Sequence, residues 1–165
     1  LANEVTNVQK RQRELYADLD ERIKKLEPRE VTIDGQTAEV EVSEQKSYEA
    51  AIAMFKSGDY KTAATALADF VRRYPASSYA ANAQYWLGNT YYADRDYKKA
   101  IAAQRDVVAN YGDSAKAPDA LLNIASSYTE LKDKKSARKA LQDLIAKYPD
   151  SSAAQDAAAR LKTLK

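Results

Sequence analysis

The chain has 165 residues, of which 45% are apolar, and a net charge of +2, which fits one globular domain with a short attachment. It contains neither cysteine nor histidine, so disulfides and thiol chemistry are excluded, and the usual general base and commonest metal ligand are missing. No apolar run approaches the roughly 18 residues of a membrane span, and basic residues are mixed with acidic ones, which argues against nucleic-acid binding.

Residues 1–27 are expected to form an oligomerising coiled-coil helix. Apolar residues in "LANEVTNVQKRQRELYADLDERIKKL" recur at alternating spacings of three and four, the period of a heptad seam. The seam positions expected to carry self-association are Val5, Val8, Gln12, Leu15, Leu19 and Leu26. A lone amphipathic surface helix is the alternative, because the segment is shorter than four heptads. The seam is already running at Leu1, so we expect a truncated coiled coil from a trimmed chain.

Residues 28–44 are expected to form a linker. Pro28 ends the preceding helix, because the residue before a proline is disfavoured in the α region. Apolar residues alternate on both sides of Asp34-Gly35, a pattern that also fits a short hairpin. Since an isolated two-stranded hairpin is marginal in water, a tether between the first helix and the main domain is the primary interpretation.

Residues 45–165 contain a repeat with a period of 37 residues. At this offset Tyr74, Tyr111 and Tyr148 align, and the Tyr-Pro-x-Ser motif or a near copy follows each time. The other aligned positions are Asp59, Asp96 and Asp133; Ala63, Ala100 and Ala137; and Ser77, Ser114 and Ser151. An apolar helical period runs before and after each aspartate, so each unit is predicted to be a helix–turn–helix. The serines lie where a hydroxyl could cap the helix that follows.

The units fit the tetratricopeptide pattern of Leu-Gly, Tyr, Ala and Pro. Leu87, Gly88, Tyr91 and Ala100 match in the second unit, and Ala51 and Ala125 stand where Gly88 does. A small residue there lets paired helices approach closely. Trp86 does not fall where the pattern has its tryptophan. The expected fold is therefore all-α, a solenoid of three tetratricopeptide repeats with a C-terminal capping helix.

One face of the first helices is predicted to bind a partner protein, as solenoids expose such a face by construction. Side chains at spacings of three and four could stack on, and hydrogen-bond to, an extended peptide or a helix. The predicted groove residues are Tyr48, Ile52, Phe55, Asn82, Tyr85, Asn89, Tyr92, Leu122 and Ser126. The alternative is that these side chains only fill the packing between repeats.

The sequence offers no constellation for chemistry. There is no glycine-rich phosphate loop, and carboxylate pairs such as Asp18/Asp20 and Asp94/Asp96 lie on expected helix or turn surfaces. We therefore expect no enzyme activity, no catalytic residues, no metal and no cofactor.

Several segments together resemble the CpoB family, also called YbgF, of Tol-Pal-associated cell-division coordinators. These are "QKRQRELYADLDERIKKLEP", the tether with "TIDG", "YAANAQYWLGNTYY", "KAPDALLNIASSYTELKD" and "IAKYPDSSAA". The resemblance implies a periplasmic protein with a trimerising coiled coil and a repeat domain. It also implies TolA and the peptidoglycan synthase complex as partners, and a role in linking peptidoglycan synthesis to outer-membrane constriction at division.

Two alternatives share the expected architecture. A scaffold of outer-membrane β-barrel assembly of the BamD kind also uses Tyr-Pro-x-Ser connections, but it needs a lipidated N-terminal cysteine, and this chain has no cysteine. A cytoplasmic co-chaperone would need a groove lined by Lys and Arg to hold a carboxylate. The predicted groove positions carry Tyr, Ile and Asn instead.

Overall fold

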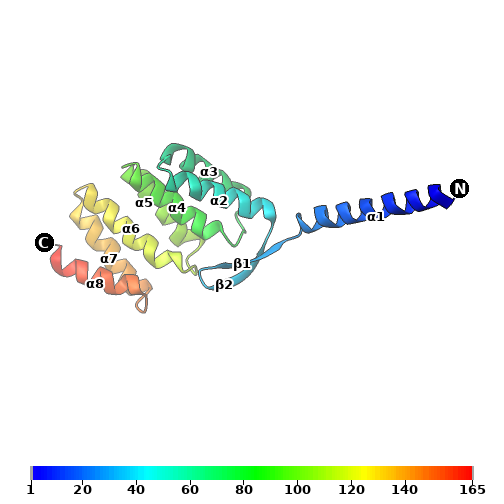
Figure 1. The fold of residues 1–165 in the computed structure, drawn as a ribbon. Coiled ribbons are helices and arrows are strands. Elements are labelled where there is room, and N and C mark those ends of the chain that lie inside the picture. The colour runs from blue at the N-terminus through cyan, green and yellow to red at the C-terminus, as the bar shows by residue number, and fades with distance from the viewer. Residues whose placement is uncertain (1, 165) are drawn as a thin grey trace.

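The computed structural model describes residues 2–164 and shows a row of stacked helices, with one further helix projecting away from it (Figure 1). The helical row is the predicted tetratricopeptide solenoid, which is thereby confirmed. Its three helical pairs and capping helix are α2 (Val42–Lys56), α3 (Tyr60–Arg73), α4 (Ala80–Ala93), α5 (Tyr97–Asn110), α6 (Lys116–Glu130), α7 (Lys134–Lys147) and α8 (Ser152–Thr163). The projecting helix is α1 (Ala2–Lys24), and a hairpin of β1 (Arg29–Ile33) and β2 (Gln36–Val40) follows it.

The repeated aspartates begin the second helix of each pair. The carboxylates of Asp59, Asp96 and Asp133 each accept the backbone N–H three residues later, at 3.2, 3.2 and 3.0 Å. A side-chain acceptor at this position satisfies one of the donors that a helix start leaves unpaired. The aspartate of the 37-residue period is therefore an N-cap.

The repeated tyrosines join consecutive repeats. The Tyr111 hydroxyl donates to the Pro75 carbonyl at 3.3 Å, and the Tyr148 hydroxyl donates to the Gly112 carbonyl at 2.9 Å. Each tyrosine thus bonds to the carbonyl of the residue that follows the tyrosine of the previous repeat, since Pro75 follows Tyr74 and Gly112 follows Tyr111. The recurrence of Tyr-Pro has a structural cause, because one copy binds the other.

The repeated serines divide into two kinds. Ser151 is the N-cap of α8 and its hydroxyl accepts the Ala154 N–H at 3.1 Å, as predicted. Ser77 and Ser114 instead accept the N–H groups of Tyr79 and Lys116, two residues on, and α4 and α6 begin without a side-chain cap. Capping by all three serines was therefore a wrong prediction.

The core forms two clusters along the solenoid. Leu67 and Phe70 are buried members of the first, and Ile124 and Leu144 are buried members of the second. Gly88 lies where α4 meets α5, and a Cβ there would stand 2.5 Å from Cδ of Gln104. The close approach of paired helices expected at this position is present in the structure.

Helix α1 buries none of the large apolar side chains that form its predicted seam. Its apolar side chains are exposed, with Val8 at 63% and Leu15 at 58%. The helix ends at Lys24, and Leu26, predicted to be a seam position, lies in the turn that follows and is 77% exposed. Within the helix the predicted seam positions therefore end at Leu19, and Leu1 lies outside the described residues.

Residues 29–40 fold as an antiparallel hairpin in place of an extended tether. Asp34 and Gly35 have φ values of 49° and 80°, and two central residues with positive φ make a tight turn that matches the twist of the strands. Val31 and Ile33 pack against the first core cluster, and the Lys116 ammonium lies 3.1 Å from the Asp34 carboxylate. The hairpin is thus docked on the repeats, and α2 already starts at Val42.

No helix in the described part of the chain combines the length and the apolar character needed to cross a bilayer.

Candidate partner-binding face

The nine predicted groove residues all lie on the first helices of the repeats, three on α2, four on α4 and two on α6. Eight of them are partly buried, and Asn82 is buried, at 8% exposure. They differ in how many packing contacts and hydrogen bonds their side chains already make within the molecule. Their role in binding stays a prediction, and the contacts of each divide them into packing residues and free surface.

In the first repeat, Tyr48 is mainly a packing residue. Its ring stacks on Tyr79 with centroids 4.4 Å apart and lies 5.9 Å from Phe70. Burial, together with the nearby negative charge of Asp34, raises the pKa of Tyr48 to about 12. Ile52 packs against the same core cluster. These two side chains stabilise the first repeat and its hairpin.

Phe55 and Tyr85 belong to an aromatic patch formed by residues of α2, α3 and α4. We define this patch as Phe55, Tyr60, Tyr85 and Trp86. The Phe55 ring lies 5.7 Å from Tyr60 and 5.1 Å from Trp86, and Trp86 lies 5.9 Å from Tyr85. All four side chains are partly exposed. Half-exposed Tyr and Trp are enriched at protein interfaces, so this patch is a candidate binding surface.

Sequence reasoning missed Trp86 and Tyr60 as members of this patch. The tetratricopeptide pattern gave Trp86 no role, because the residue is out of its usual place. Its position directly after Tyr85 was the available signal, since neighbouring aromatics on a helix can border the same surface.

Asn89 is committed to the packing of three helices. Its side-chain oxygen accepts from the Gln104 amide at 3.0 Å and from the Asn123 amide at 2.8 Å. Gln104 also donates to the Tyr85 carbonyl at 3.1 Å. The Asn89 oxygen therefore joins α4 to α5 and α6, and this atom has its acceptor sites filled. Asn82 is likewise enclosed, which corrects its placement on an open surface.

The third repeat contributes little free surface from the predicted set. Leu122 packs against the second core cluster. Ser126 donates to the Leu122 carbonyl at 3.2 Å and accepts from Arg160 at 2.8 Å. Tyr92 in the second repeat is freer: its hydroxyl reaches Glu130 only at 3.5 Å, and burial followed by the Glu130 charge raises its pKa.

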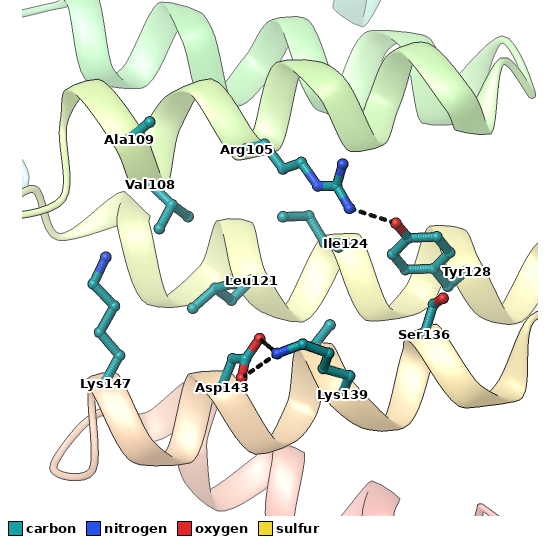
Figure 2. A pocket seen from close by; sticks show the side chains of 11 residues that line it. Arg105, Val108, Ala109, Leu121, Ile124, Tyr128, Ser136, Lys139, Asp143 and Lys147 are labelled. Atoms are coloured by element: carbon teal, nitrogen blue, oxygen red, sulfur yellow. Dashed lines mark hydrogen bonds and ion pairs between the residues drawn. The ribbon is translucent and has the colours of Figure 1, made fainter.

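A hollow of about 300 Å³ lies elsewhere, between α5, α6 and α7 (Figure 2). Val108, Leu121 and Ile124 form its apolar part. At its margin the Arg105 guanidinium donates to the Tyr128 hydroxyl at 2.6 Å, and Lys139 pairs with Asp143 at 2.8 Å (Figure 2). None of the predicted groove residues lines it, so the sequence prediction and this hollow concern different surfaces.

The face of the first helices shows no arrangement for metal chemistry. Across residues 2–164, no three or more side chains among His, Cys, Asp and Glu come together as a candidate metal site. The surface consists of aromatic rings, amides and hydroxyls. Such groups bind polypeptide through stacking and hydrogen bonds.

The fold and this face define a tetratricopeptide-repeat solenoid, a class of proteins that bind other proteins on the extended surface of their stacked helices. Residues 40–165 match the model of the YfiO family, described as outer membrane lipoprotein. The chain belongs to this family. It is also 49% identical to the cell division coordinator CpoB of Pseudomonas putida over 45 residues, which are 27% of this chain and 17% of that relative.

Solved structures at low sequence identity share the fold. A tetratricopeptide repeat protein of Parabacteroides merdae is 22% identical with a TM-score of 0.61, covering 74% of this chain and 45% of that one. The translocator chaperone SycD of Yersinia enterocolitica is 19% identical at 0.60, covering 76% and 93%. The N-terminal domain of stress-induced protein-1 of C. elegans is 11% identical at 0.64, covering 74% and 94%.

Proposed function

We propose that this chain is a non-catalytic adaptor of the bacterial periplasm that binds TolA and helps to coordinate peptidoglycan synthesis with outer-membrane constriction during cell division. The partner would bind over the aromatic patch and Tyr92, whose side chains are partly exposed. The peptidoglycan synthase complex would be the second partner.

The segment shared with the cell division coordinator CpoB carries this proposal, at 49% identity over 45 residues. The family description supports a location at the outer membrane. The aromatic patch supplies the physical means, because partly exposed aromatic rings bury a large area on binding at a small entropic cost.

A second candidate function is a scaffold in outer-membrane β-barrel assembly, of the BamD kind. The match of the YfiO family model over residues 40–165 favours it. Both candidates use the same repeat surface to hold a protein, so they differ in the partner and not in the mode of action.

Calorimetric titration of the chain with the periplasmic part of TolA tests the first candidate. We expect saturable binding that Tyr85→Ala weakens by more than tenfold, or about 1.4 kcal/mol. Tyr128→Ala is the matched control, because it removes an equally large tyrosine from the hollow between α5, α6 and α7. Asn89→Ala is unsuitable, because it would also break the contacts of Asn89 with Gln104 and Asn123.

Circular dichroism must show unchanged helix content in both variants. Equal loss of affinity in both would contradict the aromatic patch as the binding site. Absence of heat at high micromolar protein would remove TolA as the partner. The same titration with periplasmic domains of the barrel-assembly machinery then decides on the second candidate.

We further propose that α1 assembles copies of the chain, as a trimer, through its seam. Leu15→Asp should shift sedimentation toward monomer, because it places a charge in the buried seam of a coiled coil. Ala17→Asp is the control on the opposite side of the helix. A chain that sediments as a monomer at every concentration, with or without these changes, would refute assembly through α1.

A further inference from the structure

Strand β2 has an open edge. In the described part of the chain it pairs only with β1, with Ile33 opposite Gln36 next to the two-residue turn. The pair that flanks such a turn is hydrogen-bonded, and bonded and non-bonded pairs then alternate. Thr37 and Glu39 are therefore in non-bonded pairs, and their backbone N–H and C=O groups point away from β1. These groups are free to pair with another strand.

A hollow of about 250 Å³ borders the hairpin, and Gln36, Thr37 and Ala38 of β2 contribute to its lining. The rest of the lining comes from Ile33 and Asp34 at the hairpin turn, from Ser78, Ala81 and Asn82 around the start of α4, and from residues 113–115. A strand added to β2 would therefore have room for side chains in this hollow.

Asn82 adds an unmet hydrogen bond to this hollow. Its side chain is 8% exposed, and Oδ1 is buried without a hydrogen-bond partner. A buried acceptor without a donor lowers the stability of the folded state. Asn82 also lines the hollow, so a donor of an entering chain that reached this oxygen would satisfy it.

The charge of the hairpin indicates the kind of chain that enters. Glu30 and Glu39 are directly opposite each other and both exposed, and like charges opposite each other destabilise a two-stranded sheet. Residues 28–44 carry one arginine against five acidic residues. A cationic side chain beside Glu39 would relieve this repulsion.

We infer that the open edge of β2 accepts an extended, basic segment of a partner protein as a third strand. Its backbone pairs with Thr37 and Glu39. Its inward side chains enter the hollow beside Asn82, and its outward side chains carry positive charge to Glu39. This surface is separate from the aromatic patch and stands independently of the proposed function.

Fluorescence anisotropy of a labelled octapeptide that alternates threonine and lysine tests this inference on the full chain. We expect saturable binding, reduced at least tenfold by Thr37→Pro. Proline there removes only an outward N–H and so leaves the pairing with β1 intact. Thr32→Pro removes the corresponding outward N–H of β1 and should change binding less than twofold. Glu39→Gln should weaken binding several-fold.

Two further measurements keep the test decisive. A peptide with four consecutive lysines followed by four threonines has the same charge but lacks the alternation, so it should bind at least tenfold more weakly. Hydrogen exchange of the wild-type chain should show protection of the Thr37 and Glu39 amides on addition of the alternating peptide. Equal binding of both peptides, unprotected amides, equal effects of the two proline variants, or no binding at millimolar peptide would each overturn the inference.

Discussion

Helix α1 and the helices of the repeats contain the same kinds of apolar residue, but they bury them to opposite extents. Val8 and Leu15 of α1 are 63% and 58% exposed, whereas Leu67 and Leu144 in the repeats are fully buried. Each repeat helix finds its partner in the next helix along the chain. For α1 the described residues offer none, so its apolar seam is exposed.

The largest expected effect that tests this contrast is the loss of a buried leucine. Leu144→Ala should lower the free energy of unfolding by about 2–5 kcal/mol, because it leaves a cavity in the second core cluster. Leu15→Ala in α1 should change it by less than about 0.5 kcal/mol in dilute solution, as expected of an exposed side chain. Urea unfolding followed by circular dichroism measures both. Comparable losses would mean that α1 is packed in the isolated chain.

The next effect is the preference between glycine and alanine, which is opposite in the two regions. Gly88→Ala should destabilise the repeats by about 1–3 kcal/mol, because the new methyl would overlap the buried Gln104 side chain. In an exposed helix alanine is instead favoured over glycine. Ala17→Gly should therefore make formation of the α1 helix less favourable by about 1 kcal/mol and lower its helix content.

The Gln104→Ala background sharpens the test of Gly88. With the Gln104 side chain truncated, Gly88→Ala should cost much less than in the wild-type chain, in a double-mutant cycle measured by urea unfolding. An unchanged cost would show that the close approach of α4 and α5 is not the reason for glycine at this position.

The smallest effect concerns the surface of the repeats. Asp96→Ala should cost about 1 kcal/mol, because it removes the N-cap of α5, whereas Asp96→Asn keeps an acceptor and should cost less. Hydrogen bonds from the Lys99 backbone N–H and ammonium hold the pKa of Asp96 below its usual value.

The sign of the pH dependence follows from that lowered pKa. The stability from the Asp96 charge is present above the unfolded pKa, about 3.9, and is lost as the pH falls through the lower folded pKa. The difference in unfolding free energy between wild type and Asp96→Asn should therefore shrink as the pH falls below about 4. A difference that stays constant over this range would exclude a charge effect at this cap.

The repeats could be predicted from sequence because the residues that make their contacts recur every 37 residues. The aspartate caps and the tyrosines of the 37-residue period occur three times, so chance agreement is small, and the helices follow from them. The docked hairpin could not be predicted in the same way. It depends on contacts such as that of Asp34 with Lys116, which are far apart in sequence and occur only once.

The candidate binding face was predictable in outline but not residue by residue. Spacing places Tyr85 and Asn89 on the same helix face. It cannot show that the Asn89 oxygen is used by Gln104 and Asn123, or that Trp86 lies against Phe55. Those facts depend on which side chains of neighbouring helices meet, and helical periodicity carries no information about them.

The bonds from Tyr111 to Pro75 and from Tyr148 to Gly112 make the array modular. At both junctions a tyrosine hydroxyl bonds to the carbonyl at the same place in the period, so this bond does not itself fix the number of units. Deletion of residues 76–112 would remove one period and bring the Tyr148 hydroxyl to the Pro75 carbonyl, the acceptor that Tyr111 now uses. Loss or gain of whole periods would therefore keep this tyrosine bond at each remaining junction, whereas contacts that occur once, such as that of Asp34 with Lys116, would be lost.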